Sequence, residues 1–195
     1  MRDEGLAADL VLGLPRGGVV VAAEVARALE RPLDVLIVRK IGHPWQREFA
    51  VGALAEPDVA VLDEESLGGI PAVRAQLEQV IAEETRRLRE YRTRFQRGAA
   101  PDLRDRAVLL VDDGLATGAT MEAAALAAKK SRARRIVVAV PVASPAAVER
   151  LERVADDVLA LLVDPDFDAV GRYYAAFTQT SDEEVLALLQ AKPEV

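Results

Sequence analysis

The 195-residue chain is 51% hydrophobic and 29% charged, as is typical of a globular protein, and its formal net charge of −7 argues against wholesale binding of nucleic acid. It contains no cysteine, which excludes disulfides and thiolate chemistry. His43 is its only histidine, which leaves few ligands for a zinc site and few candidates for a Ser-His-Asp triad. Because no uncharged apolar run of about eighteen residues occurs and the first residues lack the core of a secretory signal, we expect a cytoplasmic protein with no membrane partner.

A strand, a glycine-containing turn and a helix follow one another near the start of the chain. Residues 9–14 are mostly apolar and predict a strand, Pro15-Arg16-Gly17-Gly18 breaks it, and residues 19–29 predict a helix rich in Val and Ala. Gly17 and Gly18 let the backbone approach a ligand closely, and Arg16 adds positive charge. This pattern predicts an anion site, although a plain turn with a surface arginine fits the same residues.

A pair of cations follows the second predicted strand. Residues 33–38 form a short apolar run that ends at Arg39 and Lys40. Two adjacent cations at the carboxyl end of a strand favour a nearby anion, and a solvated strand end is the rival interpretation. Because side chains alternate along a strand, only one of the two can point into a crevice.

The next segment predicts a loop and then a hairpin. Glycine and proline punctuate residues 41–48, which predicts a loop. Residues 49–54 and 59–62 read as two strands joined by a turn at residues 56–58. A surface loop anchored by Trp45 is the favoured interpretation, and contact of this tryptophan with a base or a partner subunit is the alternative.

A long helix is predicted from residue 71 to about residue 97. Its apolar side chains recur at a spacing of three and four residues, which places them on one face. The end of this helix is rich in arginine: Arg86, Arg87, Arg89, Arg92, Arg94 and Arg97. Cations at a helix C-terminus are favoured by the helix dipole and are commonly solvated. A lid over a bound ligand and a face that contacts RNA are the other two interpretations.

The most informative stretch begins with a buried strand at residues 107–111. Asp112 and Asp113 follow this strand, and a loop with two glycines and two threonines, Gly114 to Thr120, leads into a helix at residues 121–130. Ligands of open α/β sheets bind outside the carboxyl ends of the strands, and a helix N-terminus entered through glycine suits a phosphate. Carboxylates beside it indicate a polyhydroxylated ligand or Mg²⁺. The alternative is that the aspartates merely cap the helix.

The remaining elements complete an α/β pattern. Residues 135–140 predict a buried strand closed by Pro141, Ser144 begins a helix as its N-cap, and residues 158–163 predict the last core strand. This alternation predicts a doubly wound, mostly parallel sheet flanked by helices. Four aromatic residues and a final capped helix then gather in the C-terminal part: Phe167, Tyr173, Tyr174, Phe177 and residues 181–189.

The central stretch resembles the phosphoribosyl pyrophosphate (PRPP) motif of the type I phosphoribosyltransferases. The resemblance implies that Asp112 and Asp113 are catalytic and hold the ribose hydroxyls, together with Mg²⁺ directly or indirectly. It also implies a loop that wraps the 5′-phosphate: Gly114, Leu115, Ala116, Thr117, Gly118, Ala119 and Thr120. The residues implied for pyrophosphate are Pro15, Arg16, Gly17, Gly18, Arg39 and Lys40. Residues 39–53 are similar to an uncharacterised bacterial branch of the family.

The same resemblance implies an architecture and a reaction. We expect one domain over residues 1–195, with a core at about 9–163, a small C-terminal hood at about 164–195, and the long helix. The implied enzyme is a glycosyltransferase that moves the phosphoribosyl group of PRPP to a nucleobase-like nitrogen acceptor and releases pyrophosphate. The alternative is a non-catalytic PRPP sensor that binds RNA or another protein. Relatives usually carry more chain before the first strand, which we expect to affect the hood or a homodimer; whether a homodimer forms is left open.

Overall fold

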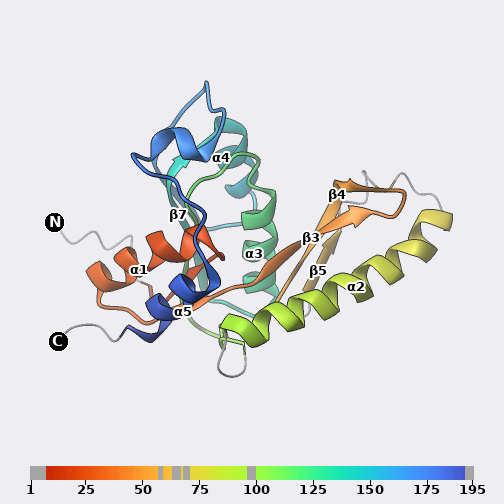
Figure 1. Ribbon diagram of the computed structural model, residues 1–195, viewed down its shortest axis with the longest axis horizontal. Helices are drawn as coiled ribbons and strands as arrows, with labels where there is room; N and C mark the ends of the chain where they lie inside the picture. Colours follow the sequence, from red (N-terminus) through yellow and green to blue (C-terminus); the bar gives the residue numbers. More distant parts are fainter. Residues whose placement is uncertain (1–7, 57–58, 63–66, 68–70, 96–99, 192–195) are drawn as a thin grey trace.

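The centre of the molecule is a five-stranded parallel sheet (Figure 1). The structure, a computed structural model, describes residues 8–56, 59–62, 67, 71–95 and 100–191. The strands of this sheet are β1 (Leu10–Gly13), β2 (Leu33–Val35), β6 (Ala107–Val111), β7 (Arg135–Ala143) and β8 (Asp157–Val163). Their order is β2-β1-β6-β7-β8, and every neighbouring pair is parallel, which confirms the predicted doubly wound sheet.

Helices cover both faces of this sheet, which explains why β6 is apolar along its whole length. Val108 and Leu110 face the cluster built around α3 (Ala119–Lys130) and α4 (Pro145–Leu151). Leu109 and Val111 face the opposite cluster, which includes residues of α1 (Gly17–Leu29). A strand buried on both faces has no polar positions to alternate with, so it reads as a continuous hydrophobic run.

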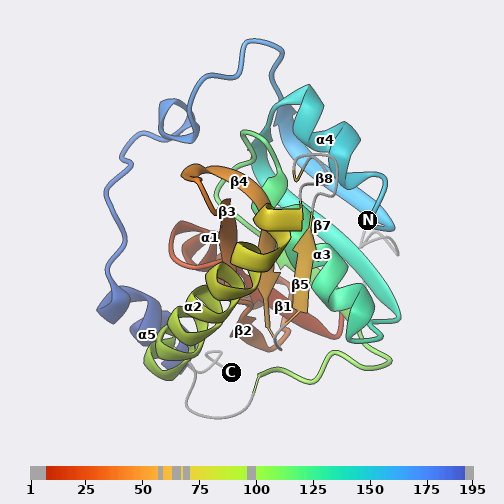
Figure 2. The same ribbon diagram turned by 90° about the vertical axis from the view of Figure 1, so that its right-hand side faces the viewer.

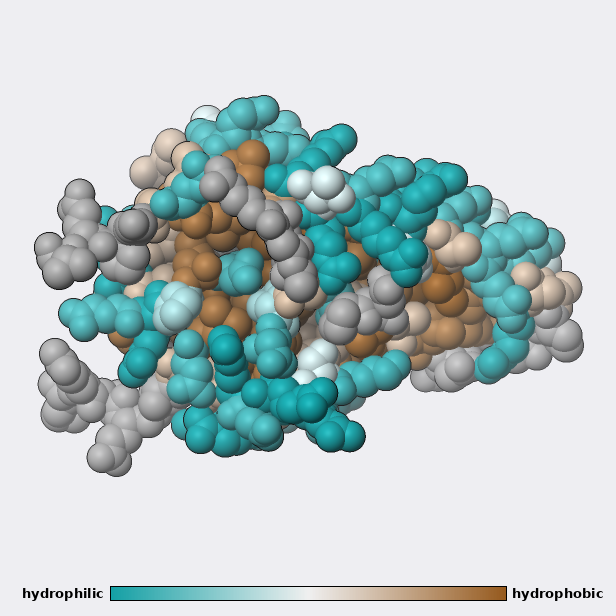
Figure 3. Space-filling view, turned by 90° about the horizontal axis from the view of Figure 1, so that it is seen from below, coloured by the Kyte–Doolittle hydropathy of each residue, from teal (hydrophilic) through white to brown (hydrophobic). Residues whose placement is uncertain are grey.

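A second, antiparallel sheet forms an arm beside the first. It consists of β3 (Val38–His43), β4 (Gln46–Ala55) and β5 (Val59–Leu62), and α2 (Pro71–Phe95) lies along it (Figure 1). Apolar side chains of α2, among them Leu77 and Leu88, pack in one cluster with residues of β3 and β4. The predicted long helix is therefore confirmed. Seen from below (Figure 3), hydrophobic residues gather both over the main body and over this arm.

The chain after β8 runs around the outside of the molecule and returns to α2 (Figure 2). A short 3₁₀ helix, η2 (Val170–Tyr173), interrupts it, and α5 (Asp182–Gln190) ends beside α1 and α2. Ser181 caps α5 with a complete capping box, as the sequence predicts. No described helix has the length and hydrophobicity that a membrane crossing requires.

The predicted strand at residues 33–38 and the predicted loop at residues 41–48 were wrong. The chain leaves the first sheet after β2 and enters the second sheet at Val38, so Arg39 and Lys40 lie within β3 rather than at the end of a parallel strand. Residues 36 and 37 between the strands are buried, and the carbonyl of Ile37 accepts from the backbone N–H of Glu56 in the arm at 3.2 Å. The supposed loop is the tip of the β3–β4 hairpin, with its turn at Pro44 and Trp45 and strand residues on both sides.

Two further expectations about the last strands were also wrong. Pro141 does not close β7, because the pairing with β8 passes over it and joins Val142 to Leu162. Strand β6 pairs with β7 only as far as Ala139, so the proline interrupts no pairing with β6. Strand β8 is an exposed edge rather than a core strand, and Leu161 is 91% exposed. The predicted turn at residues 57–58 and the predicted helix end at Arg97 lie outside the described residues.

Candidate functional site

The carboxyl ends of β1 and β6 bring the two predicted ligand loops into contact. A Cβ atom on Gly17 would overlap the carboxylate of Asp113. A Cβ atom on Gly18 would lie 2.6 Å from Oδ1 and 2.8 Å from Cα of Asp112. The first turn of α1 therefore packs so closely on the acidic pair that a side chain at Gly17 would displace the carboxylate of Asp113, and one at Gly18 would also meet backbone atoms of Asp112 and Val111. The peptide bond that precedes this turn, between Pro15 and Arg16, is cis.

The two aspartates share one partly buried position and disturb each other's ionisation. The backbone N–H of Asp113 donates to Oδ1 of Asp112 at 2.9 Å. Burial raises the pKa of Asp112 well above its ordinary value, and the neighbouring charge of Asp113 raises it further. Burial also raises the pKa of Asp113. Carboxylates in such a setting favour a ligand that supplies hydroxyl donors or a positive charge.

The loop from Gly114 to Thr120 is anchored at Leu115 and at Ala116, whose carbonyl accepts from the hydroxyl of Ser144 at 2.6 Å. The buried residue Leu115 donates its N–H to the carbonyl of Val142 and accepts from the N–H of Ser144, both at 2.9 Å. Gly118, with φ of 71°, is the N-cap of α3, and no side chain caps this helix. The aspartates therefore do not cap α3. The N–H of Ala119 donates to Oγ1 of Thr117 at 3.4 Å, and the positive end of the helix dipole makes this helix start suitable for an anion.

The C-terminal segment reaches back to the acidic pair. The hydroxyl of Tyr174 donates to the backbone carbonyl of Asp113 at 2.6 Å. Burial, together with the charges of Asp113 and Asp112, raises the pKa of Tyr174 to about 12. The rings of Tyr174 and Phe177 lie 5.3 Å apart. Two of the four aromatic residues expected in the C-terminal part therefore lie near the acidic pair, and Tyr174 contacts the backbone of Asp113 directly.

A cavity of about 820 Å³ opens between α1, α5 and this segment. Its wall joins groups from three distant parts of the sequence: Arg16, Gly17, Val20, Val21, Asp113, Tyr174, Ala176, Phe177, Thr178, Gln179, Thr180, Glu184, Ala187 and Leu188. The lining combines charged, apolar and aromatic side chains. The cavity can therefore hold a ligand with an anionic part and a flat organic part.

Asp182 is a residue that the sequence argument missed. Its carboxylate pairs with Arg16 at 3.8 Å and with Arg94 of α2 at 3.2 Å. Asp182 thereby links the first loop, α2 and the C-terminal helix beside the cavity. The capping pattern at residues 181–184 places it in the first turn of α5, but no local signal indicates its two distant partners.

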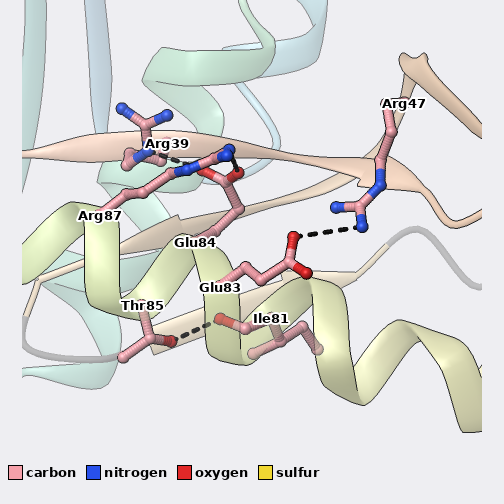
Figure 4. Close-up of polar contacts among 7 residues, drawn as sticks. All are labelled: Arg39, Arg47, Ile81, Glu83, Glu84, Thr85 and Arg87. Atoms are coloured by element: carbon pink, nitrogen blue, oxygen red, sulfur yellow. Dashed lines mark hydrogen bonds and ion pairs between the residues drawn. The ribbon is translucent and has the colours of Figure 1, made fainter.

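Arg39 and Lys40 lie elsewhere in the described structure. Neither belongs to the lining of the 820 Å³ cavity. Arg39 donates from Nε to Glu84 of α2 at 2.7 Å (Figure 4). Arg39 and Lys40 both line a separate cavity beside that helix. Lys40 also borders a third cavity, of about 510 Å³, together with Ala119 and Thr120 at the start of α3.

The arginine-rich end of α2 is largely engaged with carboxylates. Arg87 pairs with Glu84 at 2.6 Å, Arg94 pairs with Asp182, and Arg92 pairs with the buried Glu56 at 2.7 Å. The pair of Arg92 links α2 to Glu56 of the arm and the pair of Arg94 links it to α5, whereas Arg87 and Glu84 both belong to α2. A simple solvated helix end does not describe these arginines.

The acidic pair suits Mg²⁺ only in combination with a ligand. Asp112 and Asp113 offer the hard oxygen donors that Mg²⁺ prefers. Among the described residues, however, no group of three or more His, Cys, Asp or Glu side chains converges. A magnesium ion here would complete its coordination with oxygens of a bound ligand and with water.

Comparisons with known proteins agree with this arrangement. A family model described as a phosphoribosyl transferase domain matches residues 2–175. Two Mycobacterium tuberculosis proteins, from strains CDC 1551 and H37Rv, are provisionally named phosphoribosyl transferases, and each is 45% identical over 183 residues, which are 93% of this chain. The chain spans only 41% of their length. The crystal structure of the protein TT1426 from Thermus thermophilus has 49% identity and a TM-score of 0.81, with 95% of this chain and 88% of that one covered.

Proposed function

The chain belongs to the phosphoribosyl transferase domain family, and on this premise we propose that it binds PRPP and transfers its phosphoribosyl group to a nitrogen acceptor. The observation that carries the proposal is the contact of Gly17 and Gly18 with Asp112 and Asp113. It joins a proposed pyrophosphate loop to a proposed ribose site at the edge of a cavity large enough for a second substrate.

The proposed roles follow from the charge at each place. The 5′-phosphate would lie on the loop from Gly114 to Thr120, where the N–H groups of α3 begin. Asp112 and Asp113 would accept hydrogen bonds from the ribose hydroxyls. Residues 15–18 would hold pyrophosphate, and Arg39 and Lys40 would add positive charge from the arm. The reaction then needs mainly positioning and electrostatic stabilisation, because pyrophosphate departs as positive charge develops on the ribose.

Mg²⁺ fits this proposal as the cofactor. When bound, it would neutralise charge on the pyrophosphate group, and Asp112 and Asp113 would hold it directly or through water. The protein's own part is to keep both carboxylates next to the anion loop. Burial raises the pKa of both, and the charge of Asp113 adds to the effect on Asp112, so a nearby cation would favour the ionised pair.

The proposed acceptor is a nucleobase-like ring. Tyr174 and Phe177 stand in the cavity wall beside Asp113, and aromatic side chains stack on flat rings. Because Tyr174 is hydrogen-bonded to the backbone of Asp113, an acceptor stacked on these rings would lie near the ribose site.

The test is a pyrophosphate-release assay with PRPP and Mg²⁺ over a panel of nucleobases. We expect release with at least one base, and loss of both release and PRPP binding in the double variant Asp112→Asn, Asp113→Asn. Glu149→Gln, which removes a largely exposed carboxylate on α4, is the matched control and should leave both unchanged. Undiminished PRPP binding by the double variant would refute the site.

The alternative, a non-catalytic PRPP sensor that binds RNA or another protein, has less support. It would use the arginine-rich end of α2, but Arg92 and Arg94 already pair with carboxylates of other segments. Absence of pyrophosphate release with every base, combined with a rise in Tm on adding PRPP, would favour it. A single domain, a homodimer and a cytoplasmic location stay predictions.

A further inference from the structure

The arm contains a second charged cavity, separate from the one beside Asp113. It lies between the β3–β4 hairpin and α2 and has a volume of about 460 Å³. Its lining holds four cations and two carboxylates, with one glycine: Arg39, Lys40, Arg47, Arg87, Glu83, Glu84 and Gly42. The positive groups outnumber the negative groups by two. None of these residues lines the 820 Å³ cavity.

Glu84 holds two of these arginines side by side. Its side chain is only 8% exposed, and it accepts from Nε of Arg39 at 2.7 Å and from Nη1 of Arg87 at 2.6 Å. Figure 4 shows both guanidinium groups meeting at this carboxylate. A guanidinium has five N–H donors, and each of these bonds to Glu84 uses one of them. The arrangement fixes two donor-rich planes next to each other, as recognition of a phosphate group requires.

The third arginine of the cavity pairs with an exposed carboxylate instead of a buried one. Arg47 of β4 reaches toward Glu83 across the cavity (Figure 4), with a separation of 3.2 Å. Both side chains are nearly half exposed, at 48% and 44%. Exposed ion pairs contribute little stability, so Arg47 can exchange Glu83 for a ligand at small cost.

We propose that this cavity binds an anion that carries a phosphate or diphosphate group. Arg39 and Arg87 are its fixed contacts, Arg47 closes on it from the hairpin, and Glu84 is a positioning residue. The anion has two sources, the pyrophosphate group of PRPP or a separate phosphorylated small molecule. Only the first source rests on the proposed function.

The test is isothermal titration with inorganic pyrophosphate. Arg87→Gln should weaken binding by about tenfold or more, because it removes charged hydrogen bonds. Arg86→Gln, on the same helix but outside the cavity lining, should bind like the unmodified protein. If these arginines only stabilise α2 and its contact with the arm, Arg87→Gln will lower Tm without changing the affinity for pyrophosphate, and the inference fails. It also fails if the unmodified protein binds no pyrophosphate.

Glu84→Gln gives a second, independent readout. If only the net charge of the cavity mattered, removing a carboxylate from it should strengthen anion binding. Positioning demands the opposite, because Arg39 and Arg87 then lose the group that holds them together. Weaker pyrophosphate binding supports the proposed role of Glu84, and tighter binding overturns it.

Competition identifies the source of the anion. If the cavity receives the pyrophosphate end of PRPP, saturating PRPP will prevent the binding of inorganic pyrophosphate. Arg87→Gln will then weaken the binding of PRPP as well. If it receives a separate molecule, pyrophosphate will still bind the PRPP complex, and Arg87→Gln will leave PRPP affinity unchanged. Normal PRPP binding by the Asp112→Asn, Asp113→Asn variant would instead overturn the proposed function, whatever Arg87→Gln does.

Discussion

The contact between Gly17 and Asp113 allows ligand binding to be separated from folding. The three atoms nearest to a methyl group in Gly17→Ala are all side-chain atoms of Asp113, and the nearest is the terminal oxygen Oδ2. That side chain can rotate away at a cost of about 1 kcal/mol. For a domain of this size such a loss lowers Tm by only about 2–4 °C. The carboxylate, however, leaves the position proposed for the ribose hydroxyls.

The expected loss of PRPP affinity in Gly17→Ala is much larger than its effect on stability. Hydrogen bonds that involve a charged group contribute about 1.5–3 kcal/mol. At about 1.4 kcal/mol for each factor of ten, the loss of one such bond weakens PRPP binding about 10- to 150-fold. Isothermal titration with PRPP and Mg²⁺ measures this directly, and differential scanning calorimetry measures the Tm of the free protein.

Gly18→Ala is the matched comparison, one residue further on. Its methyl group would lie 2.8 Å from Cα of Asp112 and 3.0 Å from the carbonyl oxygen of Val111, and these backbone atoms cannot rotate away. Overpacking of this kind costs about 1–3 kcal/mol, so Gly18→Ala should lose both affinity and several degrees of Tm. Normal PRPP affinity in Gly17→Ala would refute the ribose assignment. A larger fall in Tm for Gly17→Ala than for Gly18→Ala would refute the packing argument.

Two further predictions concern single carboxylates. The pKa of Asp112 in the folded protein is raised above its ordinary 3.8, so between these two pKa values the folded state retains a proton that the unfolded state releases. The free energy of unfolding therefore falls as the pH rises from the lower to the higher pKa. Asp112→Asn should therefore be more stable than the unmodified protein at pH 7 and equal to it below about pH 4 in urea denaturation; lower stability at pH 7 would contradict this. Asp182→Asn frees Arg16 and Arg94 from their shared counter-ion and should tighten PRPP binding about two- to fivefold. Weaker binding than in the control Asp168→Asn, whose exposed pair with Arg172 lies on the tail, would show that Asp182 does not compete with the ligand.

The sequence predicted best what is encoded within a few consecutive residues. The buried run of β6, the acidic pair and the glycine-entered helix are adjacent in the chain, so their order already determines that they share one edge of the sheet. The capping box at Ser181 is equally local. These parts of the fold and of the candidate site could be read from pattern alone.

The parts that failed depend on contacts between distant segments. Nothing local distinguishes a strand that continues through Leu36 and Ile37 from one that leaves its sheet there, because both residues are buried in either case. Because the strand was expected to run to residue 38, Arg39 was expected at the end of a parallel strand, whereas it lies within β3. The pairing of Asp182 with Arg16 and Arg94 joins positions more than eighty residues apart, and a single sequence carries no signal of it.

The open edge at β8 has a practical consequence for every solution experiment above. Of its seven residues only Asp157 is charged, and it contains neither lysine nor proline, the residues with which natural proteins commonly block strand addition. Its outer side has no partner strand in the described part of the chain, and Leu161 and Leu162 are exposed there. An unpaired apolar edge of this kind can pair with a strand of another molecule, so self-association should increase with protein concentration. Titrations and melting curves are best recorded in dilution series, with Leu161→Lys as a variant that blocks the edge and leaves the ligand loops untouched.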